Sequence, residues 1–220
     1  MYNFAEQQPN GMQENTITIQ KTARYFTIGN REKARYLLLC LHGYGQLPAF
    51  FGRKFEAVDP DYFVVIPEGL HRFYLEGSSG RVGASWMTKE ARQQDIDDNT
   101  IYLTKLVNSM TQNKSFEKII LLGFSQGGAT AARFYYQHQK IDHLVLWASI
   151  FPPDLQIENE VVSTPQKNYF ILGNSDPYYN EESQKETLNF YRKLNYSIIQ
   201  YVGNHSIESH VLNDLLNQLK

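Results

Sequence analysis

The chain alternates short apolar runs with longer amphipathic segments over most of its length. Apolar runs typical of buried strands occupy 36–41, 62–66, 118–122, 143–147, 169–172 and 197–202. Helical patterns lie between them, at about 47–57, 89–109, 126–139, 182–194 and 206–219. Strands that alternate with helices predict an α/β protein, with a mostly parallel central sheet and helices on both faces.

Two earlier segments, 16–20 and 24–28, alternate apolar and polar residues as half-exposed strands do, and a Gly-Asn turn signal follows at 29–30. We expect them to form an antiparallel strand pair at the N-terminal edge of the sheet. Residues 1–14 are mostly polar and predict a loose arm. A length of 220 residues suits one domain, 1–220.

Composition narrows the class of protein. Hydrophobic residues make up 42% of the chain, and no apolar run approaches the roughly 20 residues of a membrane span. The first residues do not have the pattern of a signal peptide. The single cysteine, Cys40, excludes an intrachain disulfide and lies in an apolar run, where a small buried side chain is expected. These features favour a cytoplasmic protein.

Charge and spacing argue against several kinds of ligand. The chain carries 21 basic and 23 acidic residues without a basic block, so no nucleic-acid partner is expected. No Cys/His cluster has zinc spacing, so we expect no metal. The stretch Gly43-Tyr44-Gly45 lacks the third glycine of a dinucleotide loop, and we expect no cofactor. The oligomeric state is not predicted.

The segment Gly123-Phe124-Ser125-Gln126-Gly127 reads G-x-S-x-G and lies between a predicted strand and a predicted helix. A sharp strand-to-helix turn needs small flanking residues, and it projects the central side chain above the sheet at a helix N-terminus. This context is typical of a nucleophile elbow. The sequence therefore predicts Ser125 as a catalytic nucleophile.

A serine nucleophile needs a histidine base, and the base needs an orienting carboxylate. In a parallel sheet of this kind, these residues follow the serine in the order acid, then histidine, on loops at the carboxyl ends of strands. His205 follows the last predicted strand, whereas His210 lies within the terminal helix pattern. Asp176 follows the strand 169–172, with Asp154 as the alternative acid. We predict Asp176 as the orienting acid and His205 as the base.

The loop after the strand 36–41 reads His42-Gly43-Tyr44-Gly45. An oxyanion hole takes one N–H from the residue after the nucleophile and one from a loop after an early strand. We therefore predict the N–H groups of Gln126 and Tyr44 as the donors. His42 is expected to brace this loop through its imidazole.

The segment from 71 to 80 begins at the carboxyl end of the strand 62–66 and is long for an ordinary connection. Its position predicts a mobile wall of an acyl pocket, with the apolar side chains of Phe73, Tyr74, Leu75 and Trp86. The alternative is that these four side chains hold the segment on the body of the protein.

With these parts placed, the chain resembles the phospholipase/carboxylesterase family of α/β-hydrolases, which contains the acyl-protein thioesterases. The resemblance runs from about Tyr36 to Lys220. It rests on Gly123–Ala129, on Leu41–Gly45, on Ser85-Trp86, on Phe151-Pro152, and on Asp176 and His205 at the positions of the acid and the base. The chain departs from the family at Met87-Thr88, Pro177-Tyr178-Tyr179 and Asn204, near the expected pocket.

Motif and resemblance together predict a serine hydrolase of the α/β-hydrolase fold that cleaves carboxylic esters or thioesters through an acyl-enzyme. Its substrate would be a small-molecule or acylated ester. Two alternatives stay open: a lysophospholipase or acyltransferase with the same triad, and a catalytically silent hydrolase fold that serves as a binding module.

Overall fold

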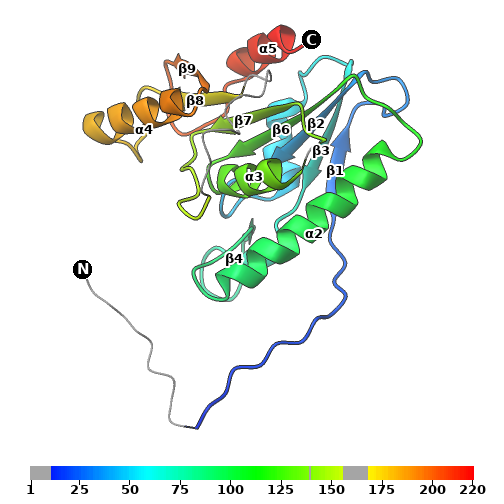
Figure 1. Cartoon of the computed structure of the whole chain (residues 1–220), viewed down its shortest axis with the longest axis vertical. Helices are drawn as coiled ribbons and strands as arrows, with labels where there is room; N and C mark the ends of the chain where they lie inside the picture. Colours follow the sequence, from blue (N-terminus) through cyan, green and yellow to red (C-terminus); the bar gives the residue numbers. More distant parts are fainter. Residues whose placement is uncertain (1–10, 139, 156–167) are drawn as a thin grey trace.

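The structure is a computed structural model that describes residues 11–138, 140–155 and 168–220 (Figure 1). Within these ranges the chain forms a seven-stranded sheet in the order β1-β3-β2-β6-β7-β8-β9. The strands are β1 (Tyr25–Ile28), β2 (Tyr36–Leu41), β3 (Tyr62–Pro67), β6 (Lys118–Phe124), β7 (His143–Trp147), β8 (Tyr169–Gly173) and β9 (Ser197–Tyr201). All six apolar runs form strands, which confirms the predicted α/β class.

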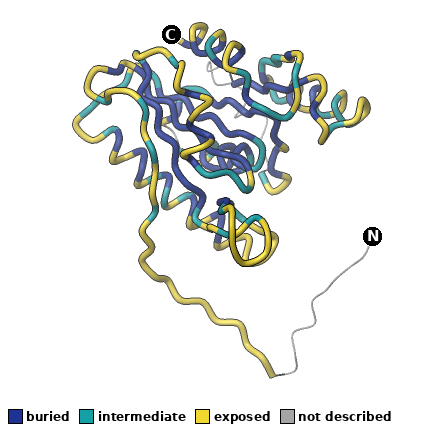
Figure 2. The backbone as a smooth tube through the Cα atoms, turned by 180° about the vertical axis from the view of Figure 1, so that it is seen from behind, coloured by how far each residue is buried: buried dark blue, intermediate teal, exposed yellow. Residues whose placement is uncertain are grey.

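The sheet is parallel except at one edge. β1 runs antiparallel to β3, with Tyr25 opposite Pro67, and the other described neighbours run parallel. The antiparallel N-terminal edge is therefore present. The predicted strand at 16–20 was wrong, because every residue of this segment is exposed and it lies outside the sheet. Figure 2 shows the described chain before β1 as an exposed stretch that runs away from the body.

Most of the described helices lie between consecutive strands, and the last one follows β9. They are α1 (Pro48–Phe51), the 3-10 helix η1 (Gly52–Phe55), α2 (Arg92–Thr111), α3 (Gln126–Gln137), α4 (Glu181–Lys193) and α5 (Ser209–Gln218). Figure 1 shows α5 on the opposite side of the sheet from α2 and α3, so both faces are covered as predicted. The helix expected at 47–57 is short and ends in 3-10 geometry. Residue 139, the predicted end of α3, lies outside the described residues.

The core follows from the apolar runs. Every residue of β2 and β3 is buried, as strands covered on both faces require. Cys40 lies in β2 with no exposed surface, and this burial raises the pKa of its thiol. It is thus the small buried side chain that the sequence predicted.

Two short strands stand apart from the main sheet. β4 (His71–Tyr74) pairs antiparallel with β5 (Val82–Ser85), so the segment expected as a loop is a hairpin. Its pattern is weak because each strand has four residues and the tip is rich in glycine and serine. An antiparallel bridge between Gln46 and Ala84 joins the hairpin to the loop after β2.

Candidate active site

Ser125 occupies the turn between β6 and α3 that the G-x-S-x-G motif predicted. Its backbone has φ 52° and ψ −121°, a conformation in which side chains are rare. The flanking glycines have no room for a side chain. A Cβ at Gly123 would lie 2.5 Å from the Gly128 Cα, and one at Gly127 would lie 2.5 Å from the His42 carbonyl oxygen. Close packing of strand and helix thus fixes the turn at Ser125, which is half-buried.

The structure brings Ser125, His205 and Asp176 together. In the neutral tautomer that fits these contacts, the Ser125 hydroxyl donates to His205 Nε2 over 3.0 Å. His205 Nδ1 donates to Asp176 Oδ2 over 2.7 Å. The three residues follow β6, β9 and β8, whose carboxyl ends meet at one edge of the sheet.

Two aromatic rings flank the imidazole. The rings of Phe124 and Tyr178 lie 4.9 Å and 4.6 Å from that of His205, between centroids. Asp176 is 2% exposed and also accepts the Tyr178 backbone N–H over 3.0 Å. Burial and these contacts hold the imidazole in one orientation. The hydrophobic periodicity of the sequence gives no signal for Tyr178, which stands out only as part of a departure from the family at 177–179.

The alternative acid, Asp154, lies in a different ion pair. Arg133 Nη2 and Nε donate to its carboxylate over 2.6 and 2.8 Å, and Arg92 Nη2 donates over 2.9 Å. The hydrogen bonds from Arg133 lower the pKa of Asp154 to about 2. Asp154 therefore has a structural partner of its own.

Two backbone N–H groups near Ser125 are available to a ligand. Among the described residues, neither the Tyr44 N–H nor the Gln126 N–H has a protein acceptor. The Gln126 group belongs to the first residue of α3, where the helix dipole favours negative charge. Both are the donors that the sequence predicts for an oxyanion hole.

His42 braces the loop that carries Tyr44, as expected. Its Nδ1 donates to the Gly43 carbonyl over 2.8 Å, and its Nε2 accepts the Gly69 N–H over 3.0 Å. These two bonds require the neutral ring. Burial lowers the pKa of His42 to about 4, which keeps the ring neutral.

The four predicted pocket residues separate into two groups. Phe73 is half-buried on β4, and its ring lies 5.1 Å from that of Tyr44, between centroids. Tyr74 is exposed, and Leu75 packs against Gly45. Trp86 has no exposed surface, and its Nε1 donates to the His42 carbonyl over 2.8 Å. Its placement agrees with the alternative in which the aromatic side chain holds the segment on the body.

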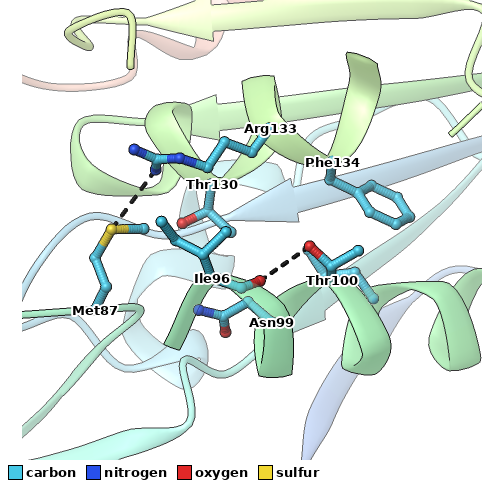
Figure 3. Close-up of a pocket in the computed structure, with 8 residues that line it drawn as sticks. Met87, Ile96, Asn99, Thr100, Thr130, Arg133 and Phe134 are labelled. Atoms are coloured by element: carbon cyan, nitrogen blue, oxygen red, sulfur yellow. Dashed lines mark hydrogen bonds between the residues drawn. The ribbon is translucent and has the colours of Figure 1, made fainter. Parts of the chain in front are cut away.

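A small pocket is lined by residues of α2 and α3 and by Met87 (Figure 3). Its volume is about 10 Å³, and it does not include Ser125, Asp176 or His205. Asn99 and Thr130 line it, and each has a buried oxygen without a partner among the described residues. The cavity is too small for an acyl chain.

No helix in 11–138, 140–155 or 168–220 combines the length and the apolar character that crossing a membrane requires. No group of three or more His, Cys, Asp or Glu side chains in the same ranges could hold a metal ion.

Known proteins resemble this chain in fold. A carboxylesterase from Mesorhizobium loti superposes with a TM-score of 0.68 at 15% identity, over 89% of this chain and 94% of that one. Acyl-protein thioesterase 2 from Zea mays gives 0.64 at 14% identity, over 90% and 98%. At these identities the likeness concerns the fold.

One curated protein matches in sequence. It is a probable 1-acylglycerol-3-phosphate O-acyltransferase from Oryza sativa subsp. japonica, 30% identical over 121 residues. The match covers 54% of this chain and 26% of the rice protein, about a quarter of its length.

The sequence profile of the Phospholipase/Carboxylesterase family matches residues 23–220. The match includes β1 and so begins before Tyr36, where the resemblance was expected to start. It covers the elbow, the loop after β2 and the segments that carry Asp176 and His205. The family match supports a hydrolase of the esterase type. The chain belongs to the phospholipase/carboxylesterase family.

Proposed function

We propose that this chain is a single-domain serine hydrolase that cleaves carboxylic esters or thioesters through an acyl-enzyme on Ser125. The observation that carries the proposal is the pair of hydrogen bonds at His205, 3.0 Å to Ser125 Oγ and 2.7 Å to Asp176 Oδ2. This is the arrangement in which a neutral histidine can accept a serine proton.

In the first half of the reaction, Ser125 Oγ attacks the substrate carbonyl while His205 Nε2 takes the hydroxyl proton. The carbonyl oxygen becomes an oxyanion, which accepts hydrogen bonds from the N–H groups of Tyr44 and Gln126. Asp176 stabilises the imidazolium through Nδ1. When the tetrahedral intermediate collapses, His205 gives its proton to the leaving alcohol or thiol.

In the second half, water attacks the acyl-enzyme. His205 takes a proton from the water, and the second oxyanion uses the same two N–H groups. Collapse releases the carboxylic acid, and the proton returns from His205 to Ser125 Oγ. Each step is a proton or acyl transfer between groups already named, so water is the only co-reactant.

A labelling experiment separates an enzyme from a silent binding module. A fluorophosphonate probe should label the wild-type protein, and Ser125→Ala should abolish both labelling and turnover. Losing the nucleophile of a triad typically costs about 10⁶-fold in kcat. Residual turnover of Ser125→Ala within tenfold of wild type would remove Ser125 from this role.

The rice relative, by its printed description a probable O-acyltransferase, favours a second candidate in which an alcohol replaces water in the second half. An acyl-ester substrate incubated with and without a lysophosphatidic acid acceptor distinguishes the two. Hydrolysis releases free acid in both mixtures, whereas acyl transfer makes the diacyl product when the acceptor is present. We expect free acid as the main product in both mixtures.

The same acyl group, offered once as an ester and once as a thioester, then shows which leaving group the protein prefers. We also infer a cytoplasmic protein from the single buried thiol, and cell fractionation tests this inference.

A further inference from the structure

Segment 84–87, which contains the end of β5 and the two residues after it, contacts the loop that carries Tyr44. The Gly45 N–H donates to the Ala84 carbonyl over 2.9 Å, and the Ala84 N–H donates to the Gln46 carbonyl over 3.3 Å. This antiparallel bridge begins one residue after Tyr44. It fixes the backbone on the C-terminal side of the Tyr44 N–H.

The same segment contacts the other donor residue. The Gln126 side-chain oxygen accepts the Trp86 backbone N–H over 3.1 Å. Gln126 Nε2 donates to the Met87 carbonyl over 2.8 Å and to Ser85 Oγ over 3.1 Å. The amide of Gln126 therefore bonds to three successive residues of segment 84–87. None of these bonds involves the Gln126 N–H, which stays free for a ligand.

Segment 84–87 is itself held firmly. Trp86 Nε1 donates to the His42 carbonyl over 2.8 Å, and Asn99 Nδ2 on α2 donates to the Trp86 carbonyl over 2.6 Å. The hairpin and the loop touch without room for a side chain, because a Cβ at Gly83 would lie 2.5 Å from the Gly45 carbonyl oxygen. A displacement of the hairpin would therefore displace the loop.

We propose that segment 84–87 is the template that aligns both oxyanion donors, with the Gln126 side chain as a positioning group. The two donors come from distant parts of the sequence, and 84–87 bonds to both residues or their neighbours. Donors stabilise an oxyanion only when they are aimed in advance at its position, so their relative placement affects the rate of the chemical step. The inference deepens the proposed function and rests on it.

The test replaces Gln126 by methionine, which has a similar length, keeps the backbone N–H and loses the amide bonds. We expect kcat on an ester substrate to fall about 10- to 100-fold with KM within about twofold, because the lost alignment affects the transition state. The inhibition constant of a trifluoromethyl ketone, whose adduct carries an oxyanion, should rise by the same factor. Gln93→Met, at an exposed position of α2, is the matched control and should change neither quantity.

A merely structural Gln126 would give a different result. The melting temperature would fall, while the active-site-titrated protein kept the wild-type kcat and inhibition constant, and this outcome overturns the proposal. Where Gln126→Met does not fold, Gly83→Ala decides from the hairpin side, with Ser109→Ala, at an exposed position of α2, as its control. Gly83→Ala should also lower kcat and raise the inhibition constant of the trifluoromethyl ketone by a similar factor. If both quantities keep their wild-type values, the template proposal is wrong.

The two proposals can fail separately. If the fluorophosphonate does not label the wild-type protein, the proposed hydrolase function is wrong. If it labels the wild type, but Gln126→Met keeps the wild-type affinity for the trifluoromethyl ketone, only the template is wrong.

Discussion

Ser125, the proposed nucleophile, has a backbone conformation that is costly for any residue with a Cβ. Its φ of 52° is held by β6 and α3, which approach so closely that the glycines around it cannot be replaced without collision. Residues in such regions typically cost about 1 to 3 kcal/mol. The tight turn causes both the backbone strain at Ser125 and the projection of its hydroxyl above the sheet.

This strain predicts a difference between two inactive variants. Ser125→Gly should be more stable than Ser125→Ala by about 1 kcal/mol, because glycine tolerates positive φ and the relief exceeds its entropy cost in the unfolded chain. Urea unfolding of both variants measures the difference. The same pair at Ser109, within helix α2, is the control and should have the opposite sign. Equal stability of the two Ser125 variants would show that the turn is not strained.

The two aspartates beside the sheet edge should fail in different ways. Asp176→Asn should lower kcat about 10⁴-fold with little loss of stability. The asparagine amide no longer selects the tautomer in which His205 Nε2 accepts the serine proton. Asp154→Asn should keep turnover but lower the free energy of unfolding by about 2 kcal/mol, since the Arg133 side chain is only 4% exposed and loses its charged partner. Kinetics and urea unfolding on both variants measure this, and an inactive but stable Asp154→Asn contradicts the assignment.

His42 should make stability fall in mild acid. Its folded pKa of about 4 lies below the ordinary value of 6.5, so the unfolded chain binds the extra proton between these values. Stability is therefore complete above about pH 6.5 and is lost as the pH falls towards 4, by about 2 kcal/mol between pH 7 and 5. Urea unfolding at both pH values, on wild type and His42→Gln, measures this share. An identical fall in the variant assigns it to other groups.

Among the elements, the β4–β5 hairpin is the one whose role the fold does not dictate. It stands outside the main sheet, and it places Phe73 against Tyr44 near the site while Trp86, just after it, is buried. A half-buried aromatic residue beside Tyr44, the proposed oxyanion donor, can contact substrate, whereas a fully buried one packs the body. We therefore propose that Phe73 affects specificity and that Trp86 affects stability.

Two alanine variants test this division. Phe73→Ala should change the ratio of kcat/KM between short and long acyl esters by about tenfold, since one or more methylene contacts are lost. Trp86→Ala should instead lower the free energy of unfolding by about 4 kcal/mol. Phe190→Ala, on α4, is the control for replacing a phenylalanine by alanine outside the hairpin. If Phe73→Ala changes kcat/KM by the same factor for every acyl chain length, the ring does not contribute to chain-length specificity.

At the scale of the whole molecule, hydrophobic periodicity predicted the strands and helices whose positions depend on burial. The strands 36–41 and 118–122 were visible because a strand covered on both faces must be continuously apolar. Strand order also predicted that Ser125, Asp176 and His205 would meet at one edge. The pattern at 16–20 misled, because alternation describes a strand only when a neighbour pairs with it. The bonds of segment 84–87 could not be predicted, since they depend on contacts between distant loops.

The parallel sheet also has a consequence for how the chain acquires activity. The serine and histidine that touch are 80 positions apart, and the histidine and aspartate are 29 apart, so no fragment made of neighbouring elements contains all three residues of the proposed triad. Long-range parallel pairing is slow, because each crossover must close before its contacts form. After dilution from urea, reactivity towards a fluorophosphonate should therefore return later than helical circular dichroism, and the delay would measure the docking of β8 and β9.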